Sequence, residues 1–229
     1  MARMLGVLMA AMLLAAQSRG DVLLYNTGTT TSDYSNSGLA VGKSGSNLFS
    51  RAQSFTNNQG ARTITSISAW LSTTESLSGT FNLSLFSSSG TPGANAIPDT
   101  QLATTGPFSA SGLNLTATAQ LISFNNLNWA IDGSASTYFF VFDARNMASD
   151  SNNYFIWQNS VPVVSGQNGA DSTNFSTWSH YSTTGAAQVY AAVPEPGTWM
   201  MMALALSMAA TWFGLRAVRR CLIPARCQP

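Results

Sequence analysis

The region between residues 22 and 190 is divided into short apolar or alternating runs by clusters of Ser, Gly, Asn and Pro. Phe81, Leu83 and Leu85 alternate with polar residues, as in a strand that is buried on one face. Residues 137–142 are apolar or aromatic almost throughout, so we expect a central strand that packs on both faces or faces a sandwich core. The region lacks a convincing helical period. The pattern therefore predicts an all-β fold, a β-sandwich or jelly roll.

The remaining strand-like runs are less regular. They cover residues 22–25, 49–55, 63–71, 101–108, 119–124, 153–158 and 188–190. Residues 27–47 are rich in Ser, Gly and Asn, and we expect a flexible stretch there.

The N-terminus has the layout of a secretory signal peptide. Arg3 supplies a positive start, residues 5–16 are apolar, and residues 16–18 (Ala-Gln-Ser) offer small side chains for cleavage. The apolar run is short for a membrane span, which favours removal of residues 1–20 over their retention as an anchor. We expect cleavage after Ser18 or near Gly20.

The C-terminal segment, residues 193–229, predicts a membrane anchor. Residues 199–215 carry no charge. As an α-helix they would span about 26 Å, close to the short limit for a bilayer core. We therefore expect a helix over about 198–215 and a basic cytoplasmic tail over 216–229, because Arg216, Arg219 and Arg220 follow the apolar run directly. The alternatives are a buried core helix of a soluble domain and a plain tail anchor.

The order of motif, helix and arginines gives a specific resemblance. Val193-Pro194-Glu195-Pro196, the apolar run and the arginines together resemble a PEP-CTERM sorting signal, over roughly the last 35 residues. The resemblance implies recognition of Pro194, Glu195 and Pro196 by an exosortase, a membrane transpeptidase-like protease, in a Gram-negative bacterium that exports exopolysaccharide. Tails of that family usually stop soon after the arginines, whereas nine more residues follow here.

The segment between the two ends, residues 21–192, is about 170 residues long, which suits one β-sandwich ectodomain with a sizeable core. Seven acidic and four basic side chains give residues 22–193 a net charge of −3, so this segment has no basic patch for nucleic acid. Cys221 and Cys227, the only cysteines, lie beyond the expected span and cannot cross-link the domain. A metal site at these cysteines is unsupported, because no other Cys or His is near.

Part of this domain has a resemblance of its own. Gln53-Ser54-Phe55, Leu83-Ser84-Leu85-Phe86 and Gly90-Thr91-Pro92-Gly93 resemble the strand and turn motifs of choice-of-anchor exported domains, most closely type R. The resemblance covers about residues 23–143. It implies a surface β-domain that occurs with different anchors, and it assigns no catalytic residues.

Candidates for catalysis are sparse. His180 is the only histidine, Glu75 is the only glutamate of the domain, and no Gly-x-Ser-x-Gly elbow occurs. We expect His180 on a surface loop, and we expect no catalytic residue, cofactor or metal. A calcium site is the open alternative in a jelly roll, although the aspartates lack an Asp-x-Asp-x-Asp spacing. Its candidate ligands are Asp132, Asp143, Asp150 and Asp171.

Trp178 and Tyr181 lie in a stretch rich in Ser and Thr, and they are the candidates for stacking on sugars. Tyr154 and Trp157 could also stack on sugars, but they are weaker candidates. For all four side chains the alternative role is packing in the core of a sandwich. The sequence thus predicts an exported, non-enzymatic surface protein, anchored in the inner membrane with its β-domain outside the cytoplasm. After processing it would be transferred to the surface or released, and its partners would be an exosortase-type enzyme, the membrane and exopolysaccharide. The alternatives are a carbohydrate-binding module and, less favoured, a hydrolase.

Overall fold

The computed structural model describes residues 21–28, 30–91, 95–132, 136–147 and 152–192, which form twelve strands and one short 3-10 helix, η1 (Ser111–Leu113). The strands are β1 (Asp21–Asn26), β2 (Tyr34–Ser44), β3 (Asn47–Asn57), β4 (Arg62–Ser72), β5 (Thr80–Ser89), β6 (Ile97–Ser109), β7 (Gln120–Ile131), β8 (Ser136–Asp143), β9 (Asn153–Ser160), β10 (Gly169–Ser172), β11 (Ser179–Tyr181) and β12 (Ala187–Ala192). The all-β class expected from the sequence is confirmed.

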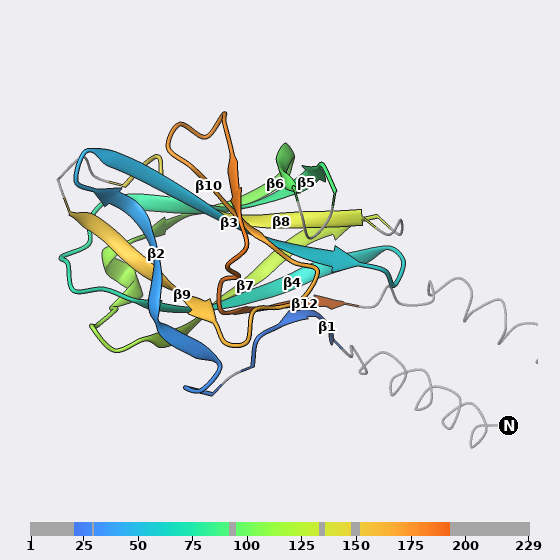
Figure 1. Ribbon diagram of the computed structural model, residues 1–229, viewed down its shortest axis with the longest axis horizontal. Coiled ribbons are helices and arrows are strands. Elements are labelled where there is room, and N and C mark those ends of the chain that lie inside the picture. Colours follow the sequence, from blue (N-terminus) through green and yellow to red (C-terminus); the bar gives the residue numbers. More distant parts are fainter. Residues whose placement is uncertain (1–20, 29, 92–94, 133–135, 148–151, 193–229) are drawn as a thin grey trace, which may run out of the picture. The chain divides into compact units, whose positions relative to one another are not determined.

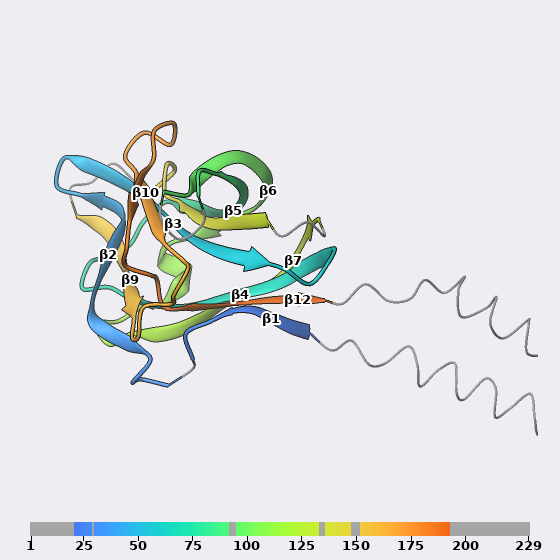
Figure 2. The ribbon, with the colours of Figure 1, turned by 45° about the vertical axis from the view of Figure 1, so that its right-hand side comes forward.

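The strands join into one large antiparallel sheet with the order β1-β12-β4-β9-β2-β3-β8-β5-β6. In addition, β7 pairs with β4, and β10 pairs with both β3 and β11. The sheet changes direction at β3, because residues 47–49 pair with β2 whereas residues 50–57 pair with β10 and β8. Figures 1 and 2 show the result, with β1, β12 and β4 on one side of the domain and β3, β8 and β5 on the other.

The change of direction brings the two halves of the sheet face to face. The ring centroid of Phe142 on β8 lies 5.6 Å from that of Phe155 and 5.0 Å from that of Trp157, both on β9, although β8 and β9 are not paired. Phe81 on β5 contacts Phe124 on β7 in the same way, at 6.0 Å. We call the buried apolar side chains between the halves the inner cluster. Among the described residues it has twenty-four members, which include Phe55, Ile67, Leu71, Phe81, Leu83, Leu85, Phe124, Phe140, Phe142, Phe155, Trp157 and Val189.

The opposite face of β3, β5 and β8 carries a second group of buried side chains, the outer cluster. Its members are Ala52, Phe86, Ala96, Phe139, Val141 and Ala170. The central strand β8 therefore contributes to both clusters, with Phe140 and Phe142 on one face and Phe139 and Val141 on the other. This confirms the expectation that residues 137–142 pack on both faces. The alternation predicted for Phe81, Leu83 and Leu85 is confirmed as well, since all three are fully buried in the inner cluster.

The expectation for residues 27–47 is wrong. Much of residues 27–47 is not a flexible stretch but strand β2, which pairs with β9 and β3. The short strands β10 and β11 were not expected from the sequence. The jelly-roll arrangement stays a prediction, because the described strands form one open antiparallel path rather than two separate sheets.

No helix within the described residues is long and apolar enough to cross a membrane. The expected signal peptide (1–20) and the expected anchor segment (193–229) lie outside those residues. The same holds for the sorting motif and the arginines, namely Val193, Pro194, Glu195, Pro196, Arg216, Arg219 and Arg220.

Candidate functional site

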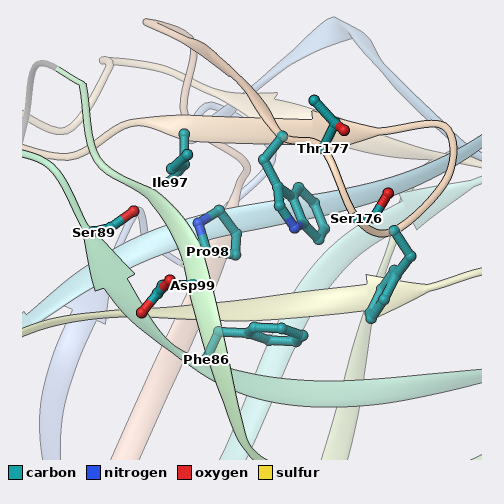
Figure 3. Close-up of a pocket in the computed structure, with 9 residues that line it drawn as sticks. Phe86, Ser89, Ile97, Pro98, Asp99, Ser176 and Thr177 are labelled. Atoms are coloured by element: carbon teal, nitrogen blue, oxygen red, sulfur yellow. The ribbon is translucent and has the colours of Figure 1, made fainter.

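A groove lies on the outer face of the sheet, between the start of β6 and the loop that joins β10 to β11. Its volume is about 390 Å³. The strand side of the groove is formed by Phe86, Ser89, Ile97, Pro98 and Asp99, and the loop side by residues 175–178. Figure 3 shows Ile97, Pro98 and Asp99 along one side, Ser176 and Thr177 along the other, and Phe86 at the base. Small-molecule sites commonly have volumes of about 300–1,000 Å³, so the groove is at the small end of that range.

Three aromatic rings form the apolar wall of the groove. Phe86 on β5 belongs to the outer cluster and is 5% exposed, whereas Phe175 and Trp178 on the loop are half-buried and pack against that cluster. The ring centroids are 5.6 Å apart for Phe86 and Phe175, 6.2 Å for Phe86 and Trp178, and 5.5 Å for Phe175 and Trp178. All three pairs meet edge to face, which is a favoured arrangement of aromatic rings. The rings therefore form one continuous apolar surface.

The loop that carries two of these rings is held by its own short side chains. The Ser172 hydroxyl accepts the Phe175 N–H at 2.8 Å. The Asn174 side-chain oxygen accepts the N–H groups of Ser176 at 2.9 Å and Thr177 at 2.8 Å. Phe175 has a φ of 61°, in the left-handed region that bulky residues rarely adopt. Such a strained backbone persists only where surrounding contacts hold it in place. Here the hydrogen bonds of Ser172 and Asn174 are those contacts.

Arg145 covers one face of Phe175. Its guanidinium carbon lies 3.8 Å from the ring centroid, within cation–π range. The same guanidinium binds Asp143 with two hydrogen bonds, 2.9 Å from Nε to Oδ1 and 2.7 Å from Nη2 to Oδ2. These bonds to Asp143 raise the pKa of Arg145. The side chain of Asp143 is buried, with 3% of it exposed. Its negative charge therefore compensates the positive charge of Arg145 next to the groove.

The rim of the groove is polar. It carries the hydroxyls of Ser89, Ser176 and Thr177 and the exposed carboxylate of Asp99. Thr100 donates a hydrogen bond from its hydroxyl to Asp99 Oδ2 at 3.2 Å, which leaves the other carboxylate oxygen, Oδ1, as a further acceptor. Among the described lining residues Asp99 is the only charged one, so the groove has a negative rim.

The two candidate sugar-stacking residues of the sequence analysis are separated by the structure. Trp178 lines the groove. Tyr181, only three positions further, packs over Gly169 on the neighbouring strand, where an added Cβ would lie 2.1 Å from a ring carbon. Burial raises the pKa of the Tyr181 hydroxyl, and the positive charge of Arg51 opposes that shift. Trp157, weighed earlier for the same role, is 2% exposed in the inner cluster. Sugar stacking itself stays a prediction.

The other candidates for chemistry are dispersed. His180 is exposed on β11, a strand rather than the expected loop. Its backbone pairs with Ala170, and its imidazole forms no hydrogen bond or ion pair with another described residue. Asp171 pairs with Arg51 at 3.3 Å, and Asp132 accepts a hydrogen bond from the Tyr138 hydroxyl at 2.7 Å. Asp150 lies outside the described residues. Within the described part of the chain, no three His, Cys, Asp or Glu side chains gather in a way that could hold a metal.

The Gln-Ser-Phe motif at residues 53–55 is part of the scaffold. Gln53 is fully buried, and its side-chain oxygen accepts the Gly185 N–H at 2.7 Å. Its side-chain nitrogen donates to the Asn168 carbonyl at 3.3 Å. The Ser54 hydroxyl accepts the Asn168 N–H at 2.8 Å. These two side chains thus fasten β3 to the segments before β10 and before β12, which positions the loop that carries the groove.

Sequence reasoning missed Phe86, Phe175 and Asp99 as groove residues. Phe86 was noted only as the end of a strand motif. The turn chemistry of Ser172 and Asn174 around Phe175 is a local signal that predicts a tight loop. The approach of this loop to β5 and β6 is a tertiary contact between residues about half the domain apart in the sequence, and no local pattern indicates it.

The C-terminal part of the chain is similar to a known protein family. Residues 192–220 match the family model of the PEP-CTERM protein-sorting motif. This confirms the resemblance stated for the C-terminal segment. The motif implies an exported, membrane-anchored protein of a Gram-negative cell, sorted to the envelope by an exosortase. No curated protein matches the chain. The resemblance of residues 23–143 to choice-of-anchor domains stays a prediction.

Proposed function

We propose that this protein is an exported surface protein that an exosortase-type enzyme recognises at Pro194, Glu195 and Pro196. The observation that carries the proposal is the sorting-motif match at residues 192–220. The chemistry of the segment agrees with it. Two prolines around Glu195 favour an extended backbone that fits an enzyme cleft, and the apolar run after them ends at arginines that prefer the cytoplasmic side.

The β-domain acts in this proposal without catalysis, in the envelope or the exopolysaccharide matrix. The proposal of a non-enzymatic role draws on the exposure of His180, the only histidine of the chain, on β11. The likeness of residues 23–143 to exported surface domains agrees with it. The calcium alternative finds no support among the described aspartates, since Asp143 and Asp171 are each paired with an arginine.

The test compares three chains in a host with its own exosortase: the intact protein, a variant with Pro194, Glu195 and Pro196 all changed to Ala, and Pro162→Ala as a control proline. Fractionation and mass spectrometry of the mature C-terminus are the readouts. We expect the intact protein and the control to reach the envelope and be cut near the motif, and the triple variant to accumulate as uncut precursor. Identical processing of all three chains would rule out the motif as the signal.

A second candidate function is carbohydrate binding by the β-domain. It is favoured by the groove on the outer face, where aromatic rings adjoin hydroxyls and one carboxylate. The test is binding of the purified full-length protein, in detergent, to the host's own exopolysaccharide. Pull-down above the level of a protein-free matrix supports this function, and its absence counts against it.

A further inference from the structure

We propose that the groove between β6 and the β10–β11 loop binds an uncharged glycan, which stacks on Phe175 and Trp178 and hydrogen-bonds to the polar rim. The proposal rests on the carbohydrate-binding function named above and adds its site and its ligand class. It does not depend on sorting by the exosortase.

The first argument is the placement of apolar surface. The apolar side chains of the outer cluster are shielded from water, and Phe86 itself is only 5% exposed. Phe175 and Trp178 pack against this cluster but are only partly buried, and their exposed parts line a cavity of about 390 Å³. Exposed aromatic surface next to a cavity on a largely polar loop is a feature of binding sites rather than of packing alone.

The second argument is preorganisation. Ser172 and Asn174 hold the loop, and Phe175 keeps a strained left-handed backbone. Arg145 packs on one face of the Phe175 ring. A site whose side chains are already fixed loses little conformational entropy when a ligand binds. This rigidity suits a weakly interacting, hydroxyl-rich ligand such as a sugar.

The third argument is charge. The guanidinium of Arg145 is paired with the buried carboxylate of Asp143 through two hydrogen bonds, so its charge is largely compensated, and it is not among the residues that line the groove. Asp99 is the charged group on the described rim, and it would repel carboxylates, sulfates and phosphates. A carboxylate accepts hydrogen bonds from sugar hydroxyls, and such charge-assisted bonds are stronger than neutral ones. The rim therefore favours an uncharged glycan over an acidic one.

A quaternary ammonium ligand is the competing occupant, because aromatic cages with a nearby carboxylate bind such cations. A cage needs rings that surround an open centre. Here the three centroids lie 5.5–6.2 Å apart and the rings touch edge to face. Rings this close leave no room for a cation between them. Because they are inclined to each other by 62–71°, a sugar would stack its apolar face on the accessible part of one ring at a time.

The experiment measures binding of the full-length protein in detergent to cellohexaose and maltohexaose as neutral probes. Polygalacturonate serves as the acidic probe and choline as the cationic one. We expect binding of at least one neutral probe, with Trp178→Ala lowering its affinity about tenfold or more, as for a central contact residue. Tyr190→Ala, which removes a half-buried aromatic side chain on β12, is the matched control and should bind as the parent does.

Asp99→Asn provides a variant that leaves all three rings in place. We expect it to bind the neutral probe about two- to fivefold more weakly, because a neutral amide is a poorer acceptor than a carboxylate. It should also bind polygalacturonate no more weakly than the parent does. Circular dichroism of each variant checks that the loss is not unfolding.

The outcomes separate the claims. Neutral-glycan binding that persists in Trp178→Ala would place the site elsewhere while leaving carbohydrate binding intact. Preference for choline or polygalacturonate over both neutral probes would overturn the ligand class. Binding to none of the glycans, the host polymer included, would overturn this proposal and the second candidate function together. The sorting proposal is decided separately, by fractionation and mass spectrometry of the mature C-terminus.

Discussion

The two faces of β5 and β8 are built from alternate residues of the same strands, yet they have different tasks. The inner face joins a cluster of twenty-four buried described residues, covered by the other half of the sheet. The outer face has a cluster of six, covered by a loop, an arginine and the start of β6. Strand pairing and ring packing fix the inner face, whereas short polar side chains fix the outer cover. The fold therefore depends on the first face, and the second is free to carry a binding site.

The largest expected effect is on the inner face, in Phe142→Ala. Phe142 is fully buried, and its ring contacts five other rings, including Phe81, Phe155 and Trp157. Removing such a ring costs about 3–5 kcal/mol, as the sum of lost transfer energy and a cavity. Denaturant unfolding followed by circular dichroism measures the change. Leu102→Ala, at a position that is 48% exposed, is the control and should shift stability by less than about 0.5 kcal/mol. A loss below about 1 kcal/mol in Phe142→Ala would mean that the inner face is not the core.

The next effect concerns the link between the two faces, tested by Gln53→Leu. The substitution leaves the Gly185 N–H without its acceptor in a buried position. A buried donor without a partner costs about 1–3 kcal/mol. The same unfolding measurement applies, with Gln101→Leu on the exposed part of β6 as the matched control. Equal stability of the two variants would show that Gln53 does not fasten the segments that flank the loop.

The inner face was largely predictable from sequence, because alternation and apolar runs are local signals. Phe81, Leu83 and Leu85 show this directly. Strand β2 was missed because it contains Asn36, Gly38 and Gly42, residue types that have low strand propensity. Gly38 is required by a tertiary contact. A Cβ at this position would lie 2.4 Å from the Trp157 carbonyl oxygen, so glycine permits the close approach of β2 to β9.

The outer face was predictable only in part. A Ser- and Thr-rich setting indicated that Trp178 is accessible, and the structure places it in the groove. The same reasoning grouped it with Tyr181, which packs over Gly169 instead. The contact between Phe86 and Phe175 depends on how the sheet turns at β3, and a one-dimensional pattern does not encode that geometry.

A smaller effect is expected at alkaline pH, and it again tests the inner face. Burial raises the pKa of Tyr25, which is 4% exposed, above the ordinary value of about 10. The folded chain then keeps this proton at pH values where the unfolded chain has lost it. Stability is therefore fully present below about pH 10 and falls as the pH rises further, by up to about 1.4 kcal/mol per pH unit.

Unfolding free energies measured from about pH 8 to about pH 11.5, across the ordinary range of tyrosine ionisation, check this dependence. Tyr25→Phe should reduce it and leave the part due to Tyr181, whose pKa burial also raises. The substitution costs about 1 kcal/mol at neutral pH for the lost hydrogen bond to the Gly185 carbonyl. Tyr190→Phe, at a half-buried position, is the control and should keep the parent slope. An unchanged slope in Tyr25→Phe would assign the alkaline loss to other groups.

The smallest effect is expected on the outer face, in Arg145→Lys. Lysine keeps the charge beside Asp143 but loses the planar stack on Phe175 and the two-bond contact with the carboxylate. Arg145 has 51% of its side chain exposed, so we expect a stability loss below about 1 kcal/mol. Neutral-glycan affinity should fall about two- to threefold, because the Phe175 ring is held less firmly. A stability loss as large as that of Phe142→Ala would contradict the division between the faces, since it would make the outer cover part of the core.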